Sequence, residues 1–141
     1  MDVLVRNRAP AREGVCIVAR CGNMVLLTRF RDETPELWSF PSRGNVRSSY
    51  RHAARSSLVH LTSLDLDRSR FARLQWDYVD LGRGNMAAVV GIDLTSSEMA
   101  HMPPASASGK LLLRMFPISE IGTTINLRPQ DAAVIKSLRL R

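Results

Sequence analysis

Arginine recurs at every fourth position between residues 43 and 55. The guanidinium group forms paired hydrogen bonds with phosphate oxygens, so this spacing suits the binding of a phosphate group or an RNA backbone. In a helix the last three of these side chains would share one face, because residues four positions apart are neighbours. Two interpretations stay open, a solvated helix face and a phosphate-binding face. The residues concerned are Arg43, Arg47, Arg51 and Arg55.

Carboxylates are missing from the same stretch, since no Asp or Glu occurs between Glu36 and Asp65. A hard cation such as Mg²⁺ needs oxygen ligands, and carboxylates are the strongest that a protein offers. His52 and His60 are eight residues apart, and they would lie about 80° apart around a helix. Two imidazoles that share a zinc ion on a helix are four residues apart. We therefore predict no metal site, no cofactor and no catalytic residue in this stretch.

Hydroxyl side chains follow the arginines, at Ser56, Ser57, Thr62 and Ser63. They could donate hydrogen bonds to a phosphate, or they could be ordinary hydroxyls on a helix surface. No His and carboxylate pair lies nearby in the sequence to activate one of them as a nucleophile.

Two aromatic residues, Trp76 and Tyr78, would project from the same face of a regular strand. An aromatic face of this kind can stack against nucleic acid bases, and it can equally cover one side of a sheet.

The elements that must position these residues alternate between strands and helices. Two apolar runs, at 14–20 and 24–30, flank a Gly-Asn turn and predict a hairpin. A short strand over 37–40 leads through a turn into a helix that begins near Ser48 or Ser49. Its apolar face is expected to contain Tyr50, Ala54, Leu58 and Leu61.

The second half of the chain continues this alternation. Strands are predicted over 71–79 and 86–94, joined at the Gly-rich turn 82–85. Residues 96–109 are rich in Ser, Ala and Pro and predict a loop. A strand from residue 111 follows, and a last amphipathic helix begins at Pro129, with Asp131 near its positive end. This order indicates an α/β domain.

Two segments of the chain resemble the Nudix family. The strand end and the following helix keep that family's structural residues, and a later aromatic-Pro-apolar-x-Glu-apolar phrase supports the match. The resemblance implies a mixed curved sheet sandwiched between helices (α/β/α), formed by residues 14–141 and preceded by an N-terminal arm or edge strand over residues 1–13. The matching residues are Leu37, Trp38, Phe40, Pro41, Ala53, Ala54, Leu58 and Leu64, then Phe116, Pro117, Ile118, Glu120 and Ile121.

The acidic residues of that family's signature are absent from this sequence. Its Arg-Glu pair falls on Ser56 and Ser57, its Glu-Glu pair falls on His60 and Leu61, and its final Gly falls on Ser63. The family's reaction uses such carboxylates to hold Mg²⁺ against a diphosphate. The resemblance therefore implies the fold and argues against the reaction.

Three functions are consistent with this sequence. The first is a catalytically inactive Nudix-fold protein that binds RNA or is a structural subunit of a ribonucleoprotein or other assembly. The resemblance implies this option because inactive members of the family occur among messenger-RNA processing factors and in mitochondrial ribosomes. The second is a hydrolase of nucleoside diphosphate derivatives with rearranged metal ligands. The third is a protein-binding module without nucleic acid. The second requires carboxylates that converge from among Glu33, Glu36, Glu98 and Glu120.

Composition favours an anionic partner. The 141 residues carry a net charge of +7, from 20 Lys and Arg against 13 Asp and Glu. A positive field of this kind attracts RNA, although a genome that favours Arg codons would give the same balance. We expect RNA or a ribonucleoprotein, and other protein subunits, as partners.

Location is only loosely constrained by the sequence. No apolar run reaches the roughly 18 residues of a membrane span, and Cys16 and Cys21 are expected to be free thiols in a reducing compartment. The Arg-containing first twelve residues faintly resemble a transit peptide. We therefore expect an intracellular protein, cytoplasmic or mitochondrial, with no membrane partner.

Overall fold

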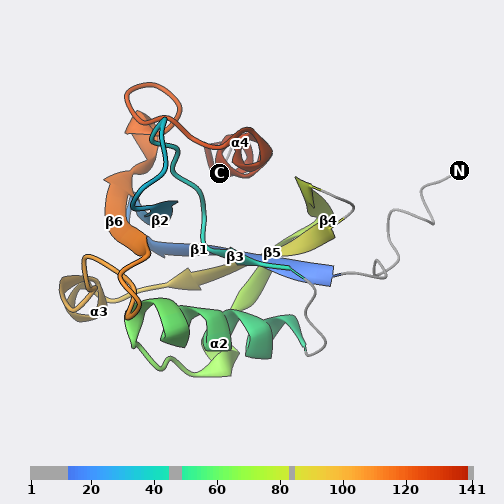
Figure 1. Ribbon diagram of the computed structural model, residues 1–141. Helices are drawn as coiled ribbons and strands as arrows, with labels where there is room; N and C mark the ends of the chain where they lie inside the picture. The colour runs from blue at the N-terminus through green and yellow to red at the C-terminus, as the bar shows by residue number, and fades with distance from the viewer. Residues whose placement is uncertain (1–12, 45–48, 83–84, 140–141) are drawn as a thin grey trace, which may run out of the picture.

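A five-strand path forms the centre of the molecule, in a computed structural model that describes residues 13–44, 49–82 and 85–139 (Figure 1). The strands lie in the order β4-β5-β1-β2-β6, and the short strand β3 pairs with β1 beside this path. The sheet is mixed, because β1 runs parallel to β5 while the other neighbours are antiparallel. The strands are β1 Glu13–Cys21, β2 Met24–Phe30, β3 Ser42–Arg43, β4 Ala72–Gly82, β5 Asn85–Asp93 and β6 Leu111–Pro117.

Helices cover both faces of the sheet. Helix α2 (Tyr50–Thr62) lies on one side and α4 (Ala132–Arg139) lies on the other, which gives the α/β/α layers expected from the sequence (Figure 1). A five-residue helix, α3 (Ser96–Ala100), precedes β6. Single turns of 3₁₀ helix complete the chain at η1 Arg68–Arg70, η2 Ile118–Glu120 and η3 Pro129–Asp131.

Strand β1 is central and supplies side chains to two separate cores. Val15, Ile17 and Ala19 pack toward α2, while Cys16 and Val18 pack toward α4. Successive side chains of a strand point to opposite faces, so a central strand covered on both sides becomes apolar throughout. The residue patterns of 14–20 and 24–30 therefore predicted these two strands correctly, and β1 begins one residue earlier, at Glu13. Residues 1–12 lie outside the described part of the chain.

Helix α2 begins where the sequence indicated. Ser49 is its N-cap, and the Ser49 hydroxyl accepts a hydrogen bond from the backbone N–H of His52; Ser48 lies outside the described residues. Ala54 and Leu58 of the expected apolar face are buried, whereas Tyr50 and Leu61 are only partly buried. Leu61 is less buried because it borders a cleft, described below.

The helix ends at Ser63 in a left-handed conformation, with φ 64°. The Ser63 N–H still donates a hydrogen bond to the carbonyl of Val59, 2.8 Å away. Gly adopts this conformation without strain, and Ser63 occupies the position where the Nudix pattern has Gly. The backbone geometry that the resemblance implies is thus kept with a less suitable residue.

Two expectations about secondary structure were wrong. Residues 37–40 do not form a regular strand, because they make only single bridges, from Ser39 to Thr28 and from Trp38 to Leu127. The stretch 96–109 is not entirely loop, because α3 forms within it. The Thr95 hydroxyl accepts from the N–H of Glu98 while the Glu98 carboxylate accepts from the N–H of Thr95, a capping box that stabilises a helix start.

Candidate functional site

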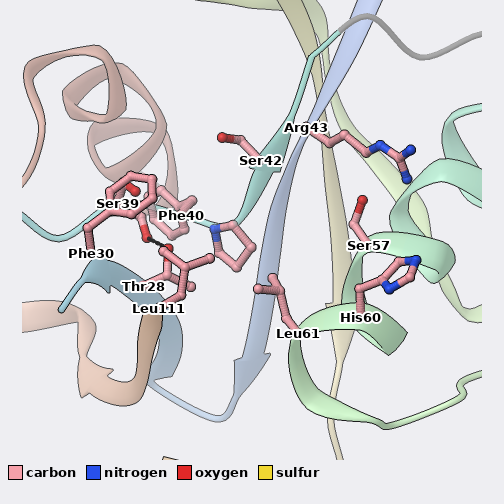
Figure 2. A pocket seen from close by; sticks show the side chains of 11 residues that line it. Thr28, Phe30, Ser39, Phe40, Ser42, Arg43, Ser57, His60, Leu61 and Leu111 are labelled. Carbon is pink, nitrogen blue, oxygen red and sulfur yellow. Dashed lines mark hydrogen bonds between the residues drawn. The ribbon is translucent and has the colours of Figure 1, made fainter. Parts of the chain in front are cut away.

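A cleft of about 370 Å³ lies between α2, the end of β2 and the segment that leads into β3 (Figure 2). Its volume falls within the range of small-molecule sites. Four parts of the chain form its walls, namely the end of β2, the segment that leads into β3, α2 and the start of β6. The lining residues are Thr28, Phe30, Ser39, Phe40, Pro41, Ser42, Arg43, Ser57, His60, Leu61 and Leu111.

Helix α2 contributes Ser57, His60 and Leu61 to this cleft. Their spacing is i, i+3 and i+4, which places the three side chains on one helix face. They are the three positions onto which the sequence resemblance places glutamates. Ser56, onto which the Arg of that pattern falls, is not part of the lining and is partly buried.

The side chains at these three positions do not fit a magnesium ion. Mg²⁺ binds oxygen ligands in near-octahedral geometry, usually including one or two carboxylates. A hydroxyl, an imidazole and a leucine supply a single weak oxygen donor among them. No acidic side chain is found among the described residues that line the cleft.

The acids that a rearranged metal site would need are engaged elsewhere. Glu33 pairs with Arg128, and Glu36 pairs with Arg29 at 3.3 Å. Glu120 lies exposed in η2, on none of the cleft's walls. Across residues 13–44, 49–82 and 85–139, no group of three or more His, Cys, Asp or Glu side chains could hold a metal ion.

The Glu98 carboxylate accepts hydrogen bonds from two different parts of the chain. It accepts from both terminal nitrogens of Arg70, at 2.6 and 2.7 Å, and it also caps α3. These hydrogen bonds, with Arg70 the larger influence, lower the pKa of Glu98 to about 2. Glu98 therefore fastens α3 to η1, and it does not line the cleft.

Arg43 is the predicted phosphate-binding arginine that the structure places at the cleft. Its side chain is exposed, and Figure 2 shows it at the same end of the cleft as Ser57 and His60. Within the part of the chain that the structure describes, no carboxylate pairs with this guanidinium. Arg47 lies outside that part.

Arg51 and Arg55 point away from the cleft, and the sequence had left open whether their face is solvated or binds a phosphate. They lie about 120° and 160° around the helix from Ser57. Arg51 donates to the carbonyl of Phe71 at 2.9 Å, and Arg55 binds Asp65 at 2.8 Å. Both guanidiniums thus fasten α2 to residues 65–71.

Tyr78, one of the two residues predicted as a possible stacking platform, does not line the cleft. Tyr78 packs against the core on the α2 side of the sheet, with the guanidinium of Arg73 4.5 Å from its ring centre. The side chain of Trp76 lies outside the described set. The pairing of β4 with β5 shifts register between Arg73 and Tyr78, so the strict alternation on which the prediction relied does not hold there.

The apolar end of the cleft was not predicted from the sequence. It consists of Phe30, at the end of β2, with Leu111 and Leu61. Phe30 is 53% exposed and is the one large hydrophobic side chain found exposed among the described residues. An aromatic residue at a strand end, beside a charged loop, was the available signal, but its partner Leu111 is 81 positions away.

Asp131 lies at a helix start, as the sequence predicted, and the structure adds that it is buried. It is 2% exposed, and its Oδ2 has no hydrogen-bond partner among the described residues. Burial raises the pKa of Asp131 to about 7, although the backbone N–H of Phe40 and the charge of Arg128 act in the opposite direction. This carboxyl lies behind Phe40 and beside Cys16, whose thiol pKa is raised by its own burial and then by Asp131.

The two cysteines and His52 do not line the cleft. Cys16 and Cys21 are free thiols, as predicted. His52 is exposed on the outer surface of α2, away from His60. No described helix is both long and apolar enough to cross a membrane.

Comparison with known proteins identifies the fold. No protein-family model matches the sequence, and no curated protein matches it. Among solved structures, the C-terminal domain of mouse MUTYH, in complex with human PCNA, matches with a TM-score of 0.68 at 18% identity over 91% of this chain and 87% of that one. A MutT structure, from a study of that protein in Aliivibrio salmonicida and Vibrio cholerae, matches with a TM-score of 0.64 at 12% identity. The match covers 93% of this chain and 98% of that one. RenU, a Nudix hydrolase of M. smegmatis, matches with a TM-score of 0.57 at 16% identity. The match covers 94% of this chain and 84% of that one.

The domain therefore has the Nudix fold, as the sequence resemblance implied. Identities of 12–18% establish shared architecture and nothing about shared chemistry. The function of this chain depends on the chemistry of its own cleft.

Proposed function

We propose that this domain is a binding module with the Nudix fold and without hydrolase activity, an RNA-binding or structural subunit of a ribonucleoprotein or other assembly. One observation carries the proposal. Ser57, His60 and Leu61 occupy the face of α2 that lines the cleft, where hydrolysis would require carboxylates to hold a divalent cation.

The charge of the protein supports an anionic partner. The net charge is +7, and Arg43 places at the cleft a guanidinium that no carboxylate of the described residues neutralises. Arg51 and Arg55 are satisfied by a backbone carbonyl and a carboxylate, so they contribute less to such binding than their spacing suggested. Among the described arginines of this set, RNA that contacts this face would depend chiefly on Arg43.

The use of this fold as a partner-binding domain has a precedent among its structural neighbours. The MUTYH C-terminal domain was solved in complex with PCNA. That complex supports the idea that a Nudix-fold domain can serve in an assembly, and it favours looking for protein subunits as well as RNA.

A second candidate is a hydrolase with rearranged ligands, which the similarity to RenU favours. It would need several of Glu33, Glu36, Glu98 and Glu120 at the cleft. Three of them form ion pairs with arginines and the fourth is on another surface, so this candidate requires a large rearrangement.

The two candidates are separated by a hydrolysis assay. The protein is incubated with a panel of nucleoside diphosphate derivatives in Mg²⁺ or Mn²⁺, and we expect no turnover above the protein-free rate. Turnover that disappears in Glu120→Gln, whose exposed side chain can be changed without disturbing the core, would establish the hydrolase instead.

RNA binding is tested in parallel by affinity measurements at increasing salt. We expect affinity to fall with salt, and Arg43→Gln to weaken it more than Arg51→Gln. Affinity that is absent at low salt would favour the protein-binding module without nucleic acid.

A further inference from the structure

The polar end of the cleft contains a buried hydroxyl to which no described residue makes a hydrogen bond. Ser57 is 8% exposed, and its Oγ makes no hydrogen bond within the described part of the chain. A buried hydroxyl of this kind destabilises the folded protein by its lost hydration. Because Ser57 lines the cleft, a ligand that enters there can supply the missing hydrogen bond.

Two further polar side chains surround the same space. Figure 2 shows Arg43 and His60 at the same end of the cleft as Ser57. No ion pair or hydrogen bond to the Arg43 or His60 side chain is made by any described residue. With no acid in the described lining, this end of the cleft attracts anions, and a guanidinium can bind two phosphate oxygens at once.

The opposite end of the cleft is suited to an uncharged ring. Phe30, Leu61 and Leu111 line it, with Phe40 and Pro41 buried behind. Phe30 offers an exposed aromatic surface, against which a nucleobase can stack. The cleft therefore has a phosphate-binding end and a ring-binding end within about 370 Å³.

We infer that the cleft binds the phosphate monoester of a nucleotide without a divalent cation. Arg43, Ser57 and His60 contact the phosphate, and the nucleoside lies against Phe30 and Leu111. The same chemistry is presented by a free nucleoside monophosphate and by the 5′-phosphorylated end of an RNA. This inference rests on the proposed function, because a metal-dependent hydrolase would hold the phosphate through its cation.

Binding is tested by calorimetry in EDTA with AMP, adenosine and inorganic phosphate as probes. We expect AMP to bind at least about tenfold more tightly than adenosine, since charged hydrogen bonds to the phosphate are lost in adenosine. The Arg43→Gln substitution should weaken the affinity for AMP by about tenfold. The matched control is Arg114→Gln, an exposed arginine on β6 that is not part of this cleft.

Ser57→Ala adds a test that does not depend on charge. This substitution should weaken the affinity for AMP about threefold to tenfold. The free protein should be at least as stable as the wild type, because the substitution removes a buried hydroxyl to which no described residue makes a hydrogen bond. Unchanged AMP affinity in a folded Ser57→Ala variant would contradict the assigned phosphate position.

The two sources are separated with a short single-stranded RNA that carries either a 5′-phosphate or a 5′-hydroxyl. A preference for the 5′-phosphate that Arg43→Gln removes would identify an RNA end as the ligand, whereas AMP binding without this preference would identify the free nucleotide. If AMP binds no better than adenosine and the RNA shows no preference, the inference is wrong. The proposed function would still stand if the protein lacked turnover and bound RNA on another surface.

Discussion

Arg55 and Asp65 are joined by two hydrogen bonds, from Nε to Oδ1 at 2.8 Å and from Nη2 to Oδ2 at 3.2 Å. Asp65 is the first acid after the acid-free stretch that contains the cleft-lining part of α2. This pair neutralises an arginine that sequence spacing assigned to ligand binding. It also shows why repeated spacing alone does not define a binding surface.

We predict that Arg55→Gln leaves RNA affinity close to that of the wild type. Its charge is already paired, and the side chain points away from the cleft. Electrophoretic titrations at low and moderate salt, with Arg43→Gln in parallel, measure the effect. Equal losses in the two variants would show that the whole stripe binds RNA.

The buried acid Asp131 should make stability depend on pH. Its folded pKa of about 7 lies above the ordinary value of 3.8, so the folded protein holds a proton that the unfolded chain releases between these values. The free energy of unfolding should therefore fall as pH rises from about 4 to about 7, and it should level off above that. A difference of one in pKa between the folded and unfolded states corresponds to about 1.4 kcal/mol, so the total is on the order of a few kcal/mol.

Urea denaturation at several pH values between about 4.5 and 8 measures this slope. Asp131→Asn cannot ionise, and its amide oxygen can still accept from the N–H of Phe40. It should flatten the slope and be more stable than the wild type at about pH 8. A wild-type slope that persists unchanged in Asp131→Asn would assign the titration to another group.

Ser63→Gly should stabilise the domain. The left-handed backbone at Ser63 is costly for a residue with a Cβ atom, whereas Gly adopts it freely. The gain is partly offset by the greater freedom of Gly in the unfolded chain, which leaves about 0.5–1 kcal/mol. Thermal unfolding measures the change, and Ser56→Gly, within the helix, should destabilise as the control.

Glutamates placed on the cleft face of α2 should create a metal site. In the triple variant Ser57→Glu, His60→Glu and Leu61→Glu, three carboxylates would share one helix face. We expect Mn²⁺ to bind this variant and not the wild type, measured by calorimetry or electron paramagnetic resonance. The matched control carries Gln at the same three positions. A folded glutamate variant without metal affinity would show that these side chains do not converge.

Local patterns in the sequence determined much of the fold. The hairpin of β1 and β2 and the Ser49 cap of α2 follow from alternation, capping and turn chemistry. Pro129 begins a 3₁₀ turn that leads directly into the last helix at Ala132, three residues later than the sequence predicted. These features depend on residues close together in the chain, so they can be inferred without knowing the rest of the structure. The acid-free stretch was equally visible, and with it the poor fit of this helix to magnesium.

The composition of the cleft was decided by tertiary structure. Leu111 and Phe30 meet because β6 pairs with β2. Ser57 is buried because α2 packs on the sheet with one particular rotation about its own helix axis. The same rotation turns Arg51 and Arg55 toward residues 65–71, and the docking of α4 buries Asp131 behind Phe40. Helix periodicity fixes which residues share a face, but only packing against distant strands fixes where that face points.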